Sequence, residues 1–341
     1  MNLSLIENVN YSASQSDSLS VIIRFHAGAS LELLAEALRS LKLQNQDNLE
    51  VVLCLQNCAA LRSSIEGTVS EIWQVTPPRM VVIEQPAAQG EDFRSAMLNA
   101  GIKNSTGRFV SFLDYDDVLL PEFHSKLIAR LQASPSAVAV CGTGCSYGGW
   151  KSGKWLETRS DKFFEYGKGK FDLLKSNFIP LHSYVADTSK FERANWQTSE
   201  SLSRFEDYLL LLKVAAQCEF DFFYHNQVLC EYRIRDDGSN STLQGKEHAS
   251  AAEKEQWAQA FQHIQDLKPS LIFQISAREL EDFITAGQKS EAECAALRQV
   301  NKDQESELGL LRQALQRKSV VMLSKFLAMF SHLRSVAKSN R

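Results

Sequence analysis

Hydrophobic residues follow two alternating patterns along the first half of the chain. Short apolar runs rich in β-branched residues are typical of buried strands, and longer segments with apolar residues every three or four positions are typical of helices. The predicted strands cover residues 19–25, 49–55, 79–84 and 108–114, and the predicted helices cover residues 30–43, 59–72, 91–102 and 121–132. Strands that alternate with helices form βαβ units, which predicts an α/β fold with a mainly parallel sheet flanked by helices.

The middle of the chain changes composition before strands and helices resume. Residues 143–170 are rich in glycine, aromatic and charged residues, which predicts loops or edge hairpins. One more helix and two more strands follow, over residues 205–217, 220–224 and 228–234. We therefore expect a globular domain over residues 18–245, preceded by a flexible polar tail over residues 1–17.

The last third of the chain has few glycines and prolines and is predicted to be helical. Over residues 246–318, steps of four and three residues form a weak heptad pattern, carried by Leu297, Asn301, Gln304, Leu308, Leu311 and Leu315. Residues 319–341 contain no acidic residue and place apolar residues on one stripe, which predicts a basic amphipathic helix. Two interpretations stay open for it: packing on its own domain, or binding to an anionic membrane surface.

Composition and charge narrow the class of protein. With 44% hydrophobic and 23% charged residues the chain is typical of soluble globular proteins, and a net charge of −4 disfavours nucleic-acid binding. The seven cysteines include no C-x-x-C pair, so neither a disulfide framework nor a zinc site is indicated. We find no signal-peptide pattern and no run of about 18 apolar residues. We therefore expect a cytoplasmic protein, peripheral at the inner membrane face if its last helix binds membrane.

An acidic segment, Asp114-Tyr115-Asp116-Asp117, ends the fourth predicted strand. Because side chains alternate along an extended chain, Asp114 and Asp116 should point to one side, and open α/β sheets bind ligands at this end of their strands. Mg²⁺ is commonly held by one or two carboxylates together with substrate phosphates. The segment therefore predicts a site for a metal ion and a diphosphate. The alternative is a turn in which Asp117 only caps the helix that begins at Pro121.

Two further polar clusters follow later in the chain. Glu206 and Asp207 precede an apolar helical run, where acids are favoured by the helix dipole, so capping and catalysis are both open for them. Arg233 and Arg235 lie in a basic, hydroxyl-rich segment after a predicted strand, where a solvated loop and a phosphate contact are the two alternatives.

The order of these motifs resembles that of family 2 glycosyltransferases, which have the GT-A fold. The resemblance covers residues 18–242. Its motifs are Gly90, Arg94, Asn99 and Gly101, then the segment from Gly107 to Asp117, then Glu206-Asp207, then Tyr232-Arg233 with Ser239 to Ser241.

This resemblance implies inverting transfer of a sugar from a nucleoside-diphosphate donor to an acceptor hydroxyl. Asp116 is then a ligand of Mn²⁺ or Mg²⁺, and Asp114 contacts the donor ribose or the metal shell. Asp207 is the general base, Glu206 positions it or shares its role, and Arg94 is one of the donor-binding residues. The implied acceptor is a glycan or a lipid-linked molecule, in the synthesis of a surface glycan or polysaccharide.

The chain departs from the usual residues of the family at three places. Gln56-Asn57 stands where an Asp-containing run is usual, so we expect an amide of either residue to contact a uracil or guanine base of a UDP or GDP donor. Arg235 replaces a usual histidine, and because arginine cannot ligate a metal, we expect it to bind the diphosphate. Residues 24–27, Arg-Phe-His-Ala, replace a usual Pro-x-Tyr-Asn.

Two other functions stay open. A nucleotidyltransferase on a related scaffold would have a phosphate loop rich in Gly, Arg and Lys after the first strand, and residues 24–30 contain one Arg and one Gly. A non-catalytic assembly protein would combine a degenerate GT-A domain with a helical tail for membrane binding or self-association. The heptads and the amphipathic terminus favour that second alternative.

Overall fold

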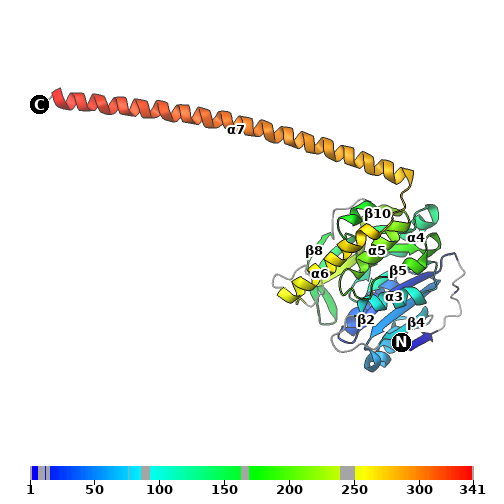
Figure 1. Cartoon of the computed structure of the whole chain (residues 1–341). Coiled ribbons are helices and arrows are strands. Elements are labelled where there is room, and N and C mark those ends of the chain that lie inside the picture. The colour runs from blue at the N-terminus through cyan, green and yellow to red at the C-terminus, as the bar shows by residue number, and fades with distance from the viewer. Residues whose placement is uncertain are drawn as a thin grey trace. The chain divides into compact units, whose positions relative to one another are not determined.

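The computed structural model describes residues 2–6, 12, 16–75, 77–85, 93–162, 169–238 and 250–339 (Figure 1). The chain divides into two units, Met1–Gln274 and Ile275–Arg341. The first unit is built on a ten-stranded sheet, and the second is formed by helix α7 (Ala277–Ser339).

Four parallel strands form the part of the sheet that the apolar runs predict. In sheet order they are β4 (Arg79–Gln85), β3 (Leu49–Gln56), β2 (Leu19–His26) and β5 (Phe109–Asp114). Strands β2, β3 and β5 are buried along almost their whole length, as expected of strands covered on both faces. The α/β fold class is therefore confirmed, and each predicted strand agrees with its observed bounds to within one residue.

Antiparallel pairs extend this block at both edges, so the sheet is mixed and not purely parallel. β9 pairs antiparallel with β5 and with β7, and β6 pairs antiparallel with β10. The order beyond β5 is β9 (Tyr184–Asp187), β7 (Val138–Lys151), β10 (Phe220–Arg235) and β6 (Val118–Leu119). The short strands β9 and β6 have no counterpart in the sequence prediction, because runs of four and two residues carry too little periodicity.

The remaining strands lie where the sequence predicts a hairpin and a tail. β8 (Lys154–Lys162) forms an antiparallel hairpin with β7, which confirms the edge hairpin expected within residues 143–170. At the opposite edge of the sheet, β1 (Asn2–Ile6) pairs antiparallel with β4. The segment expected to be a flexible tail over residues 1–17 therefore contains a strand.

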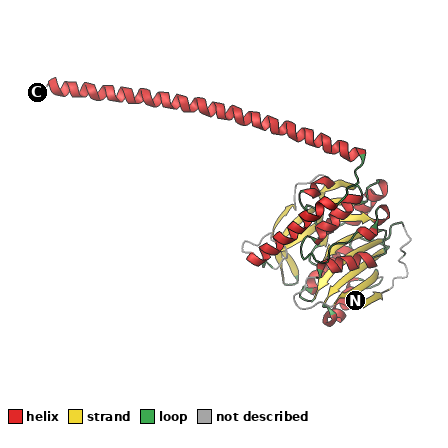
Figure 2. Ribbon diagram, in the orientation of Figure 1, coloured by secondary structure: helices red, strands yellow, loops and turns green. Residues whose placement is uncertain are grey.

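Helices cover both faces of the sheet, and the sheet separates the hydrophobic core into two parts (Figure 2). α1 begins after Ser30, whose Oγ accepts the Leu33 N–H at 3.4 Å and so caps the helix. One face is covered by α1 (Leu31–Lys42), α2 (Arg62–Ile72) and α4 (Phe123–Ala133), and the other by α3 (Arg94–Asn104), α5 (Glu206–Gln217) and α6 (Ala251–Leu267).

α6 packs on the rest of the first unit, although its residues fall in the predicted helical extension. Ile264 is fully buried, and the rings of Trp257 and Phe205 meet edge-on with centroids 5.0 Å apart. The first unit therefore continues to Gln274, past the boundary expected near residue 245. The sequence shows that α6 has an apolar face but not which surface covers it, and this accounts for the difference.

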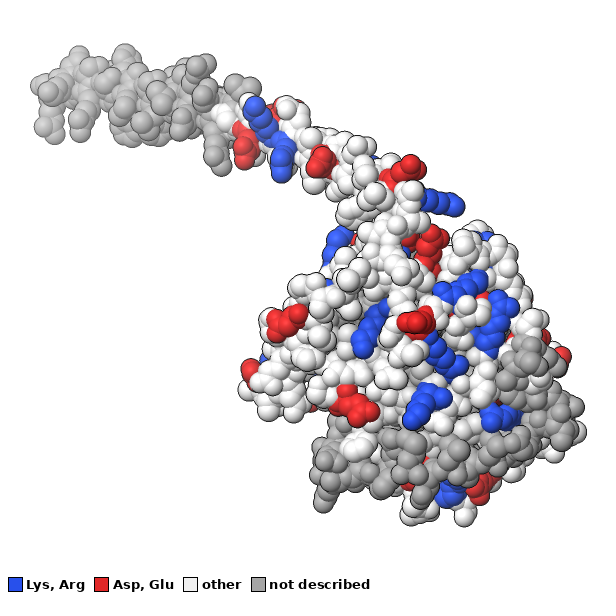
Figure 3. Space-filling model, turned by 45° about the vertical axis from the view of Figure 1, so that its right-hand side comes forward, with Lys and Arg blue, Asp and Glu red and all other residues white. Residues whose placement is uncertain are grey.

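α7 is 63 residues long and takes in both the predicted heptads and the predicted amphipathic terminus. It begins with a capping box in which Ser276 Oγ accepts the Glu279 N–H at 3.2 Å and Glu279 Oε2 accepts the Ser276 N–H at 3.0 Å. Side chains from residue 310 onward, including the basic stripe over residues 319–341, lie outside the described ones. Figure 3 shows side chains of both charges spread along the described part of α7. Within the described chain, no helix is long and apolar enough to cross a membrane.

Gly107 precedes β5 at a point where the chain passes close to β2. Its N–H donates to Ser20 Oγ at 2.8 Å, and a Cβ added at Gly107 would lie 2.6 Å from the Ser20 backbone nitrogen. We therefore expect Gly107→Ala to lower the free energy of unfolding by about 1–3 kcal/mol in chemical denaturation. Gly67→Ala on α2 is the matched control: its added Cβ meets nothing within 4 Å, so stability should rise by up to about 1 kcal/mol. Equal effects of the two changes would contradict the close approach.

Candidate active site

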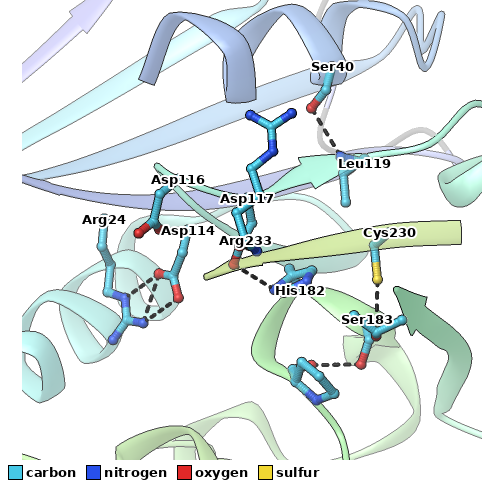
Figure 4. Close-up of polar contacts among 12 residues, drawn as sticks. Arg24, Ser40, Asp114, Asp116, Asp117, Leu119, His182, Ser183, Cys230 and Arg233 are labelled. Carbon is cyan, nitrogen blue, oxygen red and sulfur yellow. Dashed lines mark hydrogen bonds and ion pairs between the residues drawn. The ribbon is translucent and has the colours of Figure 1, made fainter. Parts of the chain in front are cut away.

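The acidic segment lies at the carboxyl end of β5, beside the end of β2 (Figure 4). Asp114 is the last residue of β5 and stands in register with Arg24 of β2. The chain then turns, and the Asp117 N–H donates to the Asp114 carbonyl at 3.1 Å. The Tyr115 ring packs edge-on against Phe25 at 5.5 Å between centroids. Because the strand ends at Asp114, alternation along a strand does not place the carboxylates of Asp116 and Asp117. The turn places them.

Arg24 joins two acidic motifs that are far apart in the sequence. Its Nε donates to Asp114 Oδ1 at 2.9 Å, its Nη2 donates to Asp114 Oδ2 at 2.9 Å, and its Nη1 donates to Glu206 Oε1 at 2.7 Å. Burial alone lowers the pKa of Arg24, but the charges of Asp114 and Glu206 outweigh burial and raise the pKa above its ordinary value. The guanidinium therefore holds the end of β5 and the start of α5 in one charged site.

Arg24 is not among the residues that the sequence predicts for the site. Its signal in the sequence is a charged residue inside the apolar run 19–25, because a buried strand tolerates a charge only when a counter-charge lies close to it. The sequence does not show which acids supply that counter-charge, since they come from elements 90 and 182 residues further along the chain.

Asp116 is paired with Arg235, the last residue of β10. Arg235 Nη1 donates to Asp116 Oδ2 at 2.5 Å. Burial and the negative charge of Asp117 raise the pKa of Asp116 to about 7, against the opposing effect of Arg235. The residue predicted to bind the metal and the residue predicted to bind the diphosphate thus meet as one ion pair.

Asp117 is buried and does not cap a helix. Its Oδ1 accepts the Arg233 backbone N–H at 2.8 Å, and its Oδ2 lies 3.0 Å from His182 Nδ1 (Figure 4). α4 begins at Phe123 without a side-chain cap, so the capping alternative for Asp117 is wrong. Asp117 instead ties the acidic turn to β10.

His182 belongs to the packed interior behind the acidic turn. Its side chain is 1% exposed, and its ring stacks on that of Tyr232 with centroids 5.9 Å apart. Burial alone lowers the pKa of His182, but the charge of Asp117 outweighs burial and raises the pKa well above its ordinary value. The His182 ring is therefore placed so that its protonated form is a buried counter-charge for Asp117.

Asp207 follows Glu206 in the first turn of α5 and is held by two hydrogen bonds. Its Oδ1 accepts the Tyr208 N–H at 2.8 Å, and its Oδ2 accepts Asn177 Nδ2 at 3.1 Å. Burial and the negative charge of Glu206 raise the pKa of Asp207 to about 7. A carboxyl group with this pKa exchanges a proton near neutral pH, which is the property that a general base needs.

The charges of the site converge around Tyr232 and do not cancel. The negative charges near its hydroxyl, which with burial raise the pKa of Tyr232 above its ordinary value, are those of Asp114, Asp116, Asp117 and Asp207. The positive side chains paired with acids of the site are Arg24, Arg235 and His182. Above about pH 7, where Asp116 and Asp207 are ionised, these four acids and Glu206 outnumber the three cations, so the site has an affinity for further positive charge.

The residues fit a divalent cation only in part as the side chains stand. Over the described chain, no group of three or more His, Cys, Asp or Glu side chains gathers around one ion position. Asp114 is fully engaged by Arg24, whereas Asp116 has one carboxylate oxygen toward Arg235. Mg²⁺ and Mn²⁺ bind carboxylate oxygens in acidic sites, and phosphate oxygens of the substrate can complete their coordination. Asp116 is therefore the residue that would hold the cation.

The three other predicted donor-binding residues lie at the same edge of the sheet or at a helix start. Gln56 ends β3 in register with His26 of β2, and Asn57 follows it with a left-handed φ of 57°. Arg94 is the first residue of α3. The structure therefore places Gln56 and Asn57 one strand away from Arg24, and it assigns no ligand to any of the three.

The remaining family motifs have mixed outcomes. Asn99 is used structurally: its side chain accepts the Thr198 N–H at 2.8 Å and donates to the Thr198 carbonyl at 3.0 Å. Gly90 and the segment from Ser239 to Ser241 lie outside the described residues.

The sequence matches the family model described as Glycosyl transferase family 2 over residues 20–193, just over half of the chain. No curated protein matches it. Among solved structures, TarS 1–349 of S. aureus has a TM-score of 0.49 at 15% identity, covering 71% of this chain and 78% of that chain. The mannosyltransferase PcManGT of Pyrobaculum calidifontis, in complex with GDP-Man and Mn²⁺, has a TM-score of 0.48 at 14% identity, covering 76% of this chain and 70% of that chain.

Removal of the Arg24 guanidinium leaves Asp114 and Glu206 without their shared cation. We expect Arg24→Ala to lower the free energy of unfolding by about 3 kcal/mol at pH 8. The loss should be smaller at pH 5, because the two unpaired carboxyls gain a raised pKa and take up protons as the pH falls.

Arg39→Ala is the matched control for this change. It also removes an arginine from a carboxylate, but the Arg39 and Glu71 side chains are exposed and 3.5 Å apart. We expect a change within about 0.5 kcal/mol at either pH in urea unfolding. Similar small losses for both variants would show that Arg24 does not hold the site together.

Proposed function

Because the chain belongs to glycosyl transferase family 2, we propose that it transfers a sugar from a nucleoside-diphosphate donor to an acceptor hydroxyl, with inversion at the sugar carbon. One observation carries the proposal: the Arg24 guanidinium binds Asp114 of the first acidic motif and Glu206 of the second. Donor-side and acceptor-side carboxylates, which are remote in the sequence, therefore share one site at the carboxyl end of the parallel strands. This is where open α/β sheets bind their ligands.

The Asp116–Arg235 pair is the proposed contact for the donor diphosphate. A diphosphate offers oxygens that can take the place of the Asp116 carboxylate on Arg235, which frees Asp116 for a Mn²⁺ or Mg²⁺ ion. When bound, the cation offsets the negative charge that develops on the departing diphosphate. The exchange also relieves the excess negative charge that raises the pKa of Asp116.

The proposed contacts for the donor base lie at the end of β3. The amides of Gln56 and Asn57, at the end of β3, are the proposed contacts for a uracil or guanine edge, so the donor is of the UDP or GDP type. Arg94 and Asp114 complete the proposed donor site. The acceptor is a glycan or a lipid-linked molecule, in the synthesis of a surface glycan or polysaccharide.

Asp207 is the proposed general base. The acceptor oxygen forms a bond to the anomeric carbon while the bond from that carbon to the diphosphate breaks, and the hydroxyl proton passes to Asp207. Attack on the face opposite the leaving group inverts the configuration. Asn177 supports both protonation states, because its Nδ2 donates to the charged carboxylate and its Oδ1, which is buried with no partner among the described residues, can accept after an amide flip.

Glu206 is proposed as a positioning residue for Asp207. Its carboxylate accepts a hydrogen bond from Arg24. Burial of Asp207 and the negative charge of Glu206 together raise the pKa of Asp207. Wild-type turnover should therefore rise with pH through about 7 as Asp207 loses its proton.

Replacement of the base should separate activity from stability. We expect Asp207→Asn to lower turnover by about 10²–10⁴-fold, because the proton acceptor is lost. Since the folded-state pKa of Asp207 is raised to about 7, its contribution to stability is present at low pH and lost as the pH rises through 7. The amide does not titrate, so Asp207→Asn should unfold at a higher temperature than wild type at pH 8, with the difference vanishing below pH 4.

Asp161→Asn, which alters an exposed carboxylate on β8, is the control and should change neither turnover nor the melting temperature. Unchanged turnover in Asp207→Asn would rule out the base assignment. A lower melting temperature at pH 8 would instead rule out the raised pKa.

The cation site is tested by nucleotide binding. We expect UDP or GDP to bind wild type at least about 10-fold more tightly with Mn²⁺ than with a chelator in isothermal titration calorimetry, and Asp116→Asn to lose this difference. Asp161→Asn should keep it. Nucleotide binding to wild type that is equally tight without a divalent ion would contradict a metal role for Asp116.

A further inference from the structure

The heptad pattern of α7 extends further than the sequence prediction. The predicted steps place Asn301 and Leu308 at a positions and Leu297 at a d position of a heptad abcdefg. Counting back in sevens, Leu280 falls at a and Phe283 falls at d. One register therefore runs from the first turn of α7 through four whole heptads.

Three leucines of this seam are open to solvent. The exposed fractions of Leu280, Leu297 and Leu308 are 48%, 64% and 53%. They lie on one helix that forms its unit without a second element. A helix of this length obtains most of its stability from packing of its apolar face, so the seam requires a partner.

We propose that α7 pairs with α7 of a second copy of this chain in a parallel, in-register, two-stranded coiled coil. Asn301 supports this partner, because an asparagine at an a position favours two strands and pairs with the same asparagine of an in-register neighbour. Gly287 and Ser290 occupy an a and a d position and weaken the seam near the start of the helix. The segment from Cys294 onward therefore carries the association.

The charges beside the seam select the parallel arrangement. Glu293 occupies a g position and Arg298 the following e position, and both are exposed. In a parallel in-register pair, each g residue faces the e residue five positions later on the partner helix, so Glu293 meets Arg298 of the second copy on both sides. An antiparallel pair brings g against g, where the charged residues Glu293 and Glu307 are both acidic, and it forms no contact between Glu293 and Arg298. This pairing involves no residue of the candidate active site.

Cross-linking of Cys294 tests the parallel, in-register arrangement, because Cys294 occupies an a position, which lies on the axis between the two helices. Cys294 is the exposed cysteine, whereas Cys218 is half-buried and the others are buried. Mild oxidation of the full-length protein should convert wild type into a covalent dimer on a non-reducing gel, and Cys294→Ser should abolish the dimer. In Cys294→Ser/Gln299→Cys the thiol moves to the outer f position, so covalent dimer should form at least about 10-fold more slowly.

The mass in solution tests the association itself. In sedimentation equilibrium, full-length protein should have twice its chain mass of 38.3 kDa, and Leu297→Glu/Leu308→Glu should return it to 38.3 kDa. Gln299→Glu/Ser306→Glu adds the same charges at outer f positions and should remain a dimer. Glutamate is a good helix former, and circular dichroism should show equal helix content in both variants.

Several results would overturn the proposal. They are a monomeric wild type, a trimer, and a dimer in which Cys294 cross-links no faster than the thiol at position 299. A monomer that floats with vesicles of anionic phospholipid would also overturn it and would assign α7 to a membrane surface.

Discussion

Arg24 places one buried positive charge between Asp114 and Glu206, and the arrangement of the site depends on this shared ion pair. The carboxyl ends of β2 and β5 lie side by side in a sheet covered on both faces, where several carboxylates repel one another and lose hydration. A bidentate guanidinium offsets that cost on one side, and its third nitrogen draws the start of α5 toward the strands. Fold and chemistry therefore meet at one residue of a central strand.

The charge balance differs among the acids in a way that suits their proposed roles. Asp114, Asp116 and Asp117 are each paired with a positive side chain, but burial and neighbouring acids raise the pKa of Asp116 and of Asp207 to about 7. These two are the carboxyls proposed to exchange an arginine for a cation and to accept a proton. The fold therefore retains unfavourable charge at the two positions where the reaction would relieve it, which is a common compromise between stability and activity.

The sequence predicts what depends on local pattern and fails where distant elements meet. The four central strands and the flanking helices follow from apolar periodicity, whereas β9 and β6 are too short to be recognised and the position of α6 depends on a surface far away in the chain. The roles of Asp116 and Asp207 are predicted from ordered motifs and stay predictions. Arg24 was missed, since its counter-charges lie 90 and 182 residues away, and the buried role of Asp117 could not be seen before β10 was placed.

Release of a nucleoside diphosphate from a sugar donor is the most direct test of the proposed sugar transfer. Full-length protein is incubated with a panel of UDP-sugars and GDP-sugars in the presence of Mn²⁺, with water in place of the acceptor, and the nucleoside diphosphate formed is measured. The proposed sugar transfer requires slow release from at least one donor, and loss of that release in Asp116→Ala. Absence of release from every donor, or equal release by the variant, would contradict it.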